Sequence, residues 1–309
     1  MRELKSMEDI QLVAKAFDSD LRMKIIDILK EKKRMNLNDL SGSLGVTNGA
    51  LTSHIRLLHK AGVINIESDS GKRGSQKICF LKENKYLIDL SHEVSEQNSY
   101  EVEVPVGTFC NYSVCPTCGI AMKTKLIGEV DNPRYFDDPQ RSNAGIVWFA
   151  RGFLEYRIPN YLKWGQKPSA IQISLELSSE APGVCDEWPS DINFYINGHS
   201  LGTWTSPGDY GNVRGLYTPD WFPKMWNQYG LLKLLTVNRT GTYIDGVKIA
   251  DITVDEIGVD YKSDIVFRIA VLNDGQHAGG LTIFGKSFGN YYQDICIRIV
   301  YTQEENKAG

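Results

Sequence analysis

The spacing of apolar residues changes near residue 100, and this change constrains the fold more than any other feature of the chain. Before it, apolar side chains such as Leu21, Ile25 and Ile28 recur at the three- and four-residue intervals of amphipathic helices. After it, short apolar runs alternate with Gly, Pro, Asn and Asp, a pattern typical of strands and turns. With 309 residues the chain can bury two cores. We therefore expect two domains, residues 1–95 and residues 96–309.

Charge is unevenly distributed between these two predicted domains. Residues 22–82 hold 12 Lys and Arg against 5 Asp and Glu, whereas residues 101–309 hold 18 against 24. The net charge of −4 therefore conceals a basic segment. Basic surfaces attract the phosphates of nucleic acids.

The chain shows no pattern of a secreted or membrane-spanning protein. No apolar run approaches the ~18–20 residues of a membrane span, and the first nine residues lack the apolar stretch of a signal peptide. Six cysteines are too few for a disulfide scaffold. We expect a cytoplasmic protein with free thiols.

The first domain has the element order of a winged helix. A helix after Asp18-Ser19-Asp20 is followed by a short second helix near Asn36, which Gly45 ends. Thr47 can cap a third helix whose inward stripe is Leu51, Ile55 and Leu58, and Gly62 follows its last turn. A β-hairpin of residues 63–66 and 76–80 then forms the wing.

The outward face of the third helix suits a DNA major groove. It offers short polar side chains, which permit close approach, and one arginine that can fork onto guanine. Basic side chains at the hairpin are placed to contact phosphates. The predicted DNA contacts are Thr47, Asn48, Gly49, Thr52, Ser53, Arg56, Lys72, Arg73 and Lys77.

Residues 37–64, LNDLSGSLGVTNGALTSHIRLLHKAGVI, resemble the ArsR-type winged-helix regulators of bacteria. In that family this segment is the turn, the recognition helix and the entry to the wing, and the similarity extends over roughly residues 10–90. The resemblance implies a DNA-binding transcriptional regulator, such as a repressor, acting as a homodimer on a palindromic operator. Metal sensors of the family carry a Cys-x-Cys pair before the recognition helix, but this chain has Asn38-Asp39-Leu40 there, so the resemblance does not extend to metal sensing at that site.

The second domain is predicted to be an antiparallel β-sandwich or jelly-roll-like domain, which makes the whole an α+β multidomain protein. Asn197-Gly198 and Asp245-Gly246 are typical hairpin turns. Residues 217–227 look helical or irregular. The predicted strands are Val102–Phe109, Ala144–Phe149, Gly152–Ile158, Ala170–Leu177, Ile192–Ile196, Leu231–Val237, Ile265–Leu272 and Ile295–Tyr301.

Four cysteines in this domain permit several interpretations. Cys115-Pro116-Thr117-Cys118-Gly119 has the form of one half of a structural zinc site, with Cys110 and Cys185 as possible third and fourth ligands. A second Cys-x-x-Cys pair is missing from the sequence. A structural zinc site, a redox-sensing thiol pair and plain turn or core cysteines all stay open.

Residues 280–287, GLTIFGKS, fit the phosphate-loop pattern letter for letter. A phosphate loop works because a helix follows it and directs amide groups at the phosphates. Here the next apolar run, Ile295–Val300, is strand-like and no helix is indicated. We expect the match to be accidental.

All six tryptophans fall within residues 148–226, several of them in segments rich in Gly and Pro. Aromatic faces cover the C–H faces of sugars while polar neighbours bind the hydroxyl groups. The alternative is that most of these rings belong to the sandwich core. The predicted ligand-binding residues are Trp204, Asp209, Tyr210, Arg214, Trp221, Trp226 and His277.

The sequence therefore predicts a transcriptional regulator whose β domain senses a small molecule, such as a carbohydrate, and so modulates operator binding. The alternative is a zinc- or thiol-dependent regulator that uses Cys110, Cys115 and Cys118, with Cys185 as a fourth ligand. An enzyme is not favoured, because His-Glu-x-x-His does not occur in the chain and the sequence does not place two carboxylates across a glycosidic bond.

Overall fold

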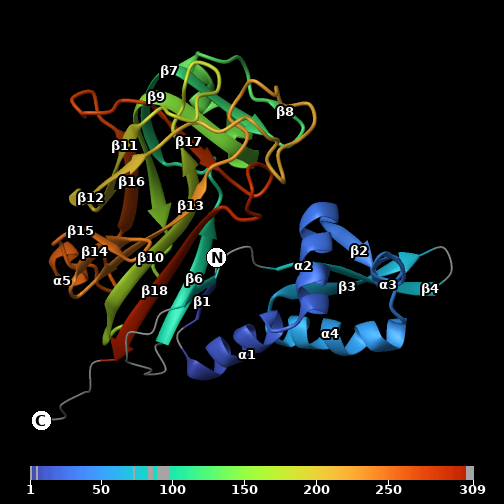
Figure 1. The fold of residues 1–309 in the computed structure, drawn as a ribbon. Helices are drawn as coiled ribbons and strands as arrows, with labels where there is room; N and C mark the ends of the chain where they lie inside the picture. Colours follow the sequence, from blue (N-terminus) through green and yellow to red (C-terminus); the bar gives the residue numbers. More distant parts are fainter. Residues whose placement is uncertain (1, 5, 72–73, 83–85, 89–97, 304–309) are drawn as a thin grey trace, which may run out of the picture. The chain divides into compact units, whose positions relative to one another are not determined.

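The computed structural model describes residues 2–4, 6–71, 74–82, 86–88 and 98–303. The chain divides into two compact units, Met1–Ser95 and Glu96–Gly309, both drawn in Figure 1. Among the described residues, no helix is long and apolar enough to cross a membrane.

The first unit is a winged helix-turn-helix, as predicted. Its strands β2, β4 and β3 form an antiparallel sheet in that order, and β1 pairs in parallel with β5. Its helices are α1 (Met7–Phe17), α2 (Asp20–Lys32), α3 (Leu37–Leu44) and α4 (Asn48–Lys60). Its strands are β1 (Arg2–Leu4), β2 (Arg34–Asn36), β3 (Ile64–Gly71), β4 (Gly74–Leu81) and β5 (Tyr86–Ile88).

Each of these helices begins at a side chain that accepts a hydrogen bond from a backbone amide of the first turn. The caps are Ser6, Ser19, Asn36 and Thr47. Such a cap satisfies an amide that has no partner within the helix. The apolar stripes of α2, α3 and α4 meet in one core that contains Ile25, Leu29, Leu40, Leu51, Ile55 and Leu58.

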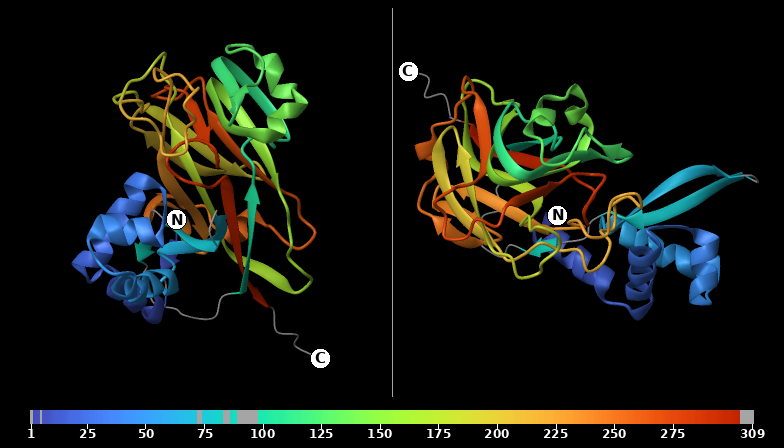
Figure 2. Two further views of the ribbon diagram at one scale, coloured as in Figure 1. Left: turned by 90° about the vertical axis from the view of Figure 1, so that its right-hand side faces the viewer. Right: turned by 90° about the horizontal axis from the view of Figure 1, so that it is seen from above.

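The second unit is an antiparallel β-sandwich, again as predicted. Its described strands pair into a single sheet of 13 strands that folds over into two layers (Figures 1 and 2). Strand β17 joins the layers, because it pairs with β9 in one and with β10 in the other. The layers run β8-β7-β9-β16-β11-β12 and β6-β18-β10-β13-β14-β15.

The bounds of these elements are as follows. The first layer contains β7 (Asn111–Met122), β8 (Lys125–Leu126), β9 (Ala144–Ile158), β11 (Ser190–Ile196), β12 (His199–Ser206) and β16 (Ile265–Val271). The second contains β6 (Asn98–Val104), β10 (Gln166–Ser178), β13 (Leu231–Asn238), β14 (Gly241–Ile244), β15 (Val247–Ala250) and β18 (Ile295–Gln303), with β17 (Leu281–Phe284) between the layers. Short helices are α5 (Val254–Ile257) and the 3₁₀ turns Pro133–Asp137 and Pro139–Asn143.

Two tight turns form where the sequence predicted them. Asn197 and Gly198 both have positive φ angles, as do Asp245 and Gly246. Two consecutive residues of that kind make the hairpin turn whose twist matches the flanking strands. The turns connect β11 to β12 and β14 to β15.

Several strand predictions need correction. The two strands expected at Ala144–Phe149 and Gly152–Ile158 are one strand, β9, because Gly152 continues it at a φ of 119°. The strand expected at Val102–Phe109 ends at Val104. Strands β7, β8, β12, β14, β15 and β17 were not predicted, whereas residues 217–227 are irregular, one of the two forms expected for them.

The phosphate-loop pattern is not a phosphate loop. Its central residues, Leu281–Phe284, form the fully buried strand β17. Turns follow, with no helix between β17 and β18. Lys286 donates to the Glu103 carboxylate, so this lysine forms an ion pair within the sandwich.

Candidate functional site

Helix α4 presents one buried face and one exposed face. Leu51, Ile55 and Leu58 are at most 3% exposed and pack in the core. The opposite face carries the predicted DNA contacts, of which Thr52 is half-buried and Thr47, Asn48, Gly49, Ser53 and Arg56 are exposed. The helix holds no acidic residue. This face is therefore open to a polyanion.

The short polar side chains on this face already have partners within the unit. The Thr52 hydroxyl donates to the Asn48 carbonyl at 2.7 Å, and the Ser53 hydroxyl donates to the Ala50 carbonyl at 3.0 Å. Each hydroxyl oxygen keeps capacity to accept a further bond. Asn48 Nδ2 donates to Asn38 Oδ1 at 2.7 Å, which ties the start of α4 to α3.

Arg56 differs from these neighbours. Its side chain is exposed and makes no hydrogen bond or ion pair with any residue that the structure describes. Within the described part of the unit, the donors of its guanidinium group therefore stay open to an outside acceptor.

Arg22 of α2 contacts both the end of α1 and helix α4. The Arg22 guanidinium donates to the carbonyls of Ala16, Lys15 and Asp18 at 2.8 Å each, and lies 3.4 Å from His54 Nδ1 on α4. One side chain thus connects the end of α1 to both α2 and α4.

The wing is the hairpin of β3 and β4. Lys77 is exposed on β4, opposite Ser68 of β3. The other two predicted wing contacts, Lys72 and Arg73, lie outside the described residues.

The seven residues predicted to bind a ligand do not form one site. Trp204 is half-buried, with Lys233 Nζ 4.6 Å from its ring centre. Tyr210 stacks on Tyr229. Arg214 donates to carbonyls of its own loop, including those of Pro219 and Phe222.

The remaining four differ in their partners and exposure. Trp221 donates from Nε1 to the Lys123 carbonyl at 2.6 Å. His277 Nδ1 lies 3.2 Å from the Asp191 carboxylate. Asp209 is fully buried, and Trp226 lines a pocket.

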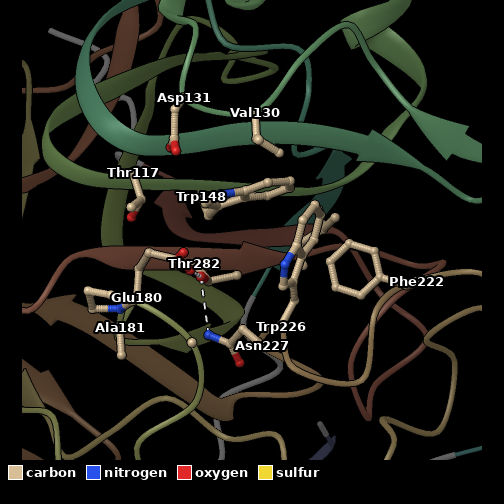
Figure 3. A pocket seen from close by; sticks show the side chains of 13 residues that line it. Thr117, Val130, Asp131, Trp148, Glu180, Ala181, Phe222, Trp226, Asn227 and Thr282 are labelled. Atoms are coloured by element: carbon tan, nitrogen blue, oxygen red, sulfur yellow. Dashed lines mark hydrogen bonds between the residues drawn. The ribbon is translucent and has the colours of Figure 1, made fainter.

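This pocket, with a volume of about 150 Å³, lies in the second unit (Figure 3). Trp226 is the one predicted ligand residue in its wall. The lining residues come from strands β7, β9 and β17 and from the loops around residues 130, 180 and 225. They are Thr117, Val130, Asp131, Ile146, Trp148, Glu180, Ala181, Pro182, Gly183, Phe222, Trp226, Asn227 and Thr282.

One part of the wall is aromatic. The ring centres of Trp148 and Trp226 lie 5.6 Å apart at 55°. Phe222 meets the Trp226 ring edge to face, at 5.2 Å and 83°. Edge-to-face pairs of this kind hold aromatic rings in place, so the wall is fixed before any ligand arrives.

Another part of the wall is polar and centres on Glu180. Its Oε2 accepts from the Thr282 hydroxyl at 2.8 Å. Burial, with repulsion from Asp209 and Asp131, raises the pKa of the Glu180 carboxyl well above its usual range, although hydrogen bonds from Thr282 and Thr117 oppose this shift. A carboxyl group with a raised pKa in a pocket marks a candidate functional site.

Asp209 does not line the pocket but contacts a residue of its wall, Ala181. Its Oδ2 accepts from the Ala181 amide at 2.9 Å. Burial raises the pKa of Asp209 to about 7, with a further contribution from Asp186.

Sequence reasoning missed most of this pocket. Asp131, Glu180 and Asn227 carry no motif, and residues from 117 to 282 in the chain meet in the wall. Trp148 stood among the tryptophans but was not chosen as a ligand residue. The concentration of tryptophans was the one signal that pointed to this region.

The predicted cysteine site is not formed. Cys118 is buried on β7, whereas Cys110 and Cys115 are exposed and Cys185 lies on a separate loop, its Sγ donating to the Glu187 carbonyl. Within the residues described, no three His, Cys, Asp or Glu side chains are placed to hold a metal ion. Burial raises the pKa of Cys118 to about 12. In this arrangement the four cysteines do not come together, and the zinc site stays a prediction.

Comparisons with known proteins agree with the winged helix. Residues 18–65 match the family model for winged helix-turn-helix DNA-binding domains. Among solved structures, HlyU from Vibrio cholerae N16961 is 18% identical, covers 25% of this chain and 77% of its own, and gives a TM-score of 0.21.

Two carbohydrate-binding modules resemble the β-sandwich. The CBM36-1 domain of a multidomain xylanase from the hindgut metagenome of Trinervitermes trinervoides is 10% identical over 65% of this chain and 96% of its own, with a TM-score of 0.29. A CBM36 module in complex with calcium and xylotriose is 12% identical over 65% and 98%, with a TM-score of 0.28. No curated protein matches the chain. Residues 18–65 thus form a winged helix-turn-helix of the DNA-binding kind, and a β-sandwich follows.

Proposed function

We propose that this protein is a DNA-binding transcriptional regulator that reads its operator with α4. The observation that carries the proposal is the exposed, acid-free face of α4, on which Arg56 has no partner among the described residues. The family match to residues 18–65 supports the same reading.

The chemistry of this face suits the major groove. Arg56 can place two parallel N–H donors on the O6 and N7 atoms of guanine, a pairing worth about 1–3 kcal/mol of discrimination against the wrong base. Gly49 and Ser53 allow the helix to approach closely. Lys77, together with Lys72 and Arg73 of the wing, contacts phosphates and so contributes affinity without sequence preference.

The β-sandwich binds a small effector in the pocket around Trp226. The indole faces of Trp148 and Trp226 can cover the C–H face of a sugar ring, while Glu180, Asn227 and Thr282 bind its hydroxyl groups. The wall therefore suits a compact ring that carries polar groups, such as a sugar or an amino sugar.

The regulator acts as a homodimer, and the effector changes its affinity for the operator. A two-fold pair of α4 helices matches a palindromic operator, since half-sites then lie one helical turn apart. Effector binding that alters the spacing of the two helices would change operator affinity through a coupling free energy of about 1–3 kcal/mol. As a repressor, the protein would release DNA when the effector binds.

A selection from randomised duplex DNA tests the role of α4. The full chain should enrich a palindromic sequence, and Arg56→Ala should enrich the same sequence with one base position in each half-site relaxed. Arg151→Ala is the matched control, because Arg151 is an exposed arginine of the second unit, outside α4. Identical motifs from the wild type and Arg56→Ala would refute the assignment of α4 as the reading helix.

A further inference from the structure

We propose that the pocket around Trp226 selects a positively charged effector, an organic ammonium group on a compact ring-sized body, over neutral or anionic molecules of the same size. This inference rests on the proposed function, because it takes the pocket to be the effector site. It goes further by assigning the charge of the ligand.

The charges in and behind the wall are all of one sign. Asp131 and Glu180 are the ionisable groups among the lining residues, and Lys, Arg and His are absent from the wall. Behind it, the buried Asp209 interacts electrostatically with Glu180. A cation in the pocket would relieve the repulsion between these carboxyl groups, whereas an anion would add to it.

The aromatic part of the wall favours the same charge. Trp148 and Trp226 both line the pocket, and Figure 3 shows them facing the space that Asp131 and Glu180 border on its other side. An ammonium group over an indole face is attracted by about 0.5–2 kcal/mol, with the larger value where water is excluded. Aromatic faces opposite carboxyl groups are how proteins bind organic cations.

Asn227 is a wall residue whose amide is held by the protein itself. Its side chain is 4% exposed, and it lines the pocket. Nδ2 donates to Ser178, Ser179 and Thr282, which fixes the amide, while Oδ1 accepts no hydrogen bond from the residues described.

The arrangement suits an organic cation better than a divalent metal ion. No three His, Cys, Asp or Glu side chains come together as ligands in the described parts of the chain. One Asp131 oxygen already accepts from the Cys118 amide at 2.9 Å. A cavity of about 150 Å³ holds a molecule with one six-membered ring.

The protonation of Glu180 should make the affinity for a cationic ligand depend on pH. Three titratable groups face it, namely Asp131, Asp209 and Cys118, and its raised pKa means that the carboxyl takes up its proton more readily than an exposed glutamate. An ammonium ligand stabilises the ionised form, so its binding releases a proton. The affinity for a cation must therefore rise as pH rises towards the pKa of Glu180.

Three ring compounds of similar size but different charge test the proposal. Cyclohexylamine, cyclohexanol and cyclohexanecarboxylate are titrated into the full chain and followed by tryptophan fluorescence, with Trp226→Phe confirming that the signal comes from the pocket. We expect cyclohexylamine to bind at least about tenfold more tightly than cyclohexanol, which corresponds to about 1.4 kcal/mol. The carboxylate should bind most weakly.

Glu180→Gln should reduce this tenfold preference for the amine to about threefold or less, with the rest supplied by Asp131 and the indole faces, while the variant still unfolds cooperatively. Glu187→Gln is the matched control, since Glu187 is exposed and does not line the pocket. Cyclohexylamine stays protonated through about pH 8, so its affinity should increase between about pH 5.5 and about pH 8. A neutral compound that accepts a hydrogen bond from protonated Glu180 should show the opposite trend.

Each contrary result overturns the inference in a distinguishable way. Equal or tighter binding of cyclohexanol would refute the charge preference and leave a neutral effector in the proposed function. Calcium that binds alone and displaces the amine would identify a metal site. Binding by none of the three ring compounds would refute the pocket as a cation site. The DNA selection with Arg56→Ala would still test the DNA-reading role of α4 independently.

Discussion

Asp209→Asn should remove a pH dependence from the stability of the β-sandwich. The Asp209 side chain is fully buried, its Oδ2 accepts from the Ala181 amide, and its Oδ1 accepts no hydrogen bond from the described residues. Burial raises the pKa of Asp209 to about 7 from an ordinary value of 3.8. The folded unit therefore holds this carboxyl protonated where the unfolded chain has already ionised it.

The sign and size of the effect follow from that difference. Between about pH 4 and about pH 7 the folded state binds one proton more than the unfolded state, so the free energy of unfolding falls as pH rises through this window. A shift of about three pH units corresponds to about 4 kcal/mol. Asparagine has nearly the same shape and accepts from Ala181, but it cannot ionise. The variant should match the wild type near pH 4 and exceed its stability by up to about 4 kcal/mol above pH 7.

Urea unfolding followed by tryptophan fluorescence measures this difference for the second unit, because all six tryptophans lie within residues 148–226. Subtracting wild type from variant at each pH cancels other titrating groups except those coupled to Asp209, namely Glu180 and Asp186. Asp274→Asn, at an exposed position, is the matched control and should give a flat difference. A flat difference for Asp209→Asn, or a wild type that gains on the variant as pH rises, would show that burial does not hold this carboxyl protonated.

Three further outcomes follow from single side chains. The buried Glu176 carboxylate accepts hydrogen bonds from the backbone amides of Gly230, Asn290 and Tyr291. Glu176→Ala should therefore lower the free energy of unfolding by about 3 kcal/mol or more, which urea unfolding measures. Thr47→Ala removes the cap of α4 and should cost the first unit about 1 kcal/mol, seen in helical circular dichroism during thermal unfolding; an unchanged midpoint would contradict the cap. Lys77→Ala should reduce the slope of log affinity against log salt by about one without changing the selected motif, measured by fluorescence anisotropy.

The winged helix was predictable because its signals are local. Thr47 caps α4 from three residues away, and the apolar stripe of α4 lies within its own 13 residues. Gly45 ends α3 at a positive φ, as a glycine after a short helix indicates. Each of these contacts joins residues that are close in the sequence, so the pattern alone places them.

The β-sandwich was predictable as a class but not in its pairings. Cys115-Pro116-Thr117-Cys118-Gly119 has the composition of a turn, yet it lies inside β7, because pairing with β9 on both sides of an irregularity at Cys115–Cys118 maintains the strand. Strand β17 has four apolar or β-branched residues within a glycine-rich pattern, and its two neighbours, β9 and β10, decide its conformation. The sequence around a strand carries no pattern that identifies such distant partners.

The pocket was harder still to predict. The sequence analysis emphasised tryptophans in loops, such as Trp204 and Trp221, but these two do not line the pocket. Lys233 lies over the Trp204 ring, and Trp221 donates a hydrogen bond to the Lys123 carbonyl. The residues that form the wall, such as Asp131, Glu180 and Thr282, come from three separate segments. Their proximity is a product of the fold, so composition alone could indicate the region and not the site.

The ratio of affinities for the selected duplex and for a scrambled duplex of the same length tests the central claim most directly. Measured by fluorescence anisotropy in one buffer and salt concentration, the full chain should favour the selected duplex by at least about a thousandfold. Arg56→Ala should reduce this ratio by about tenfold or more while it binds the scrambled duplex almost as well as the wild type. A wild-type ratio near one, or an Arg56→Ala variant with the full ratio, would contradict sequence reading by α4.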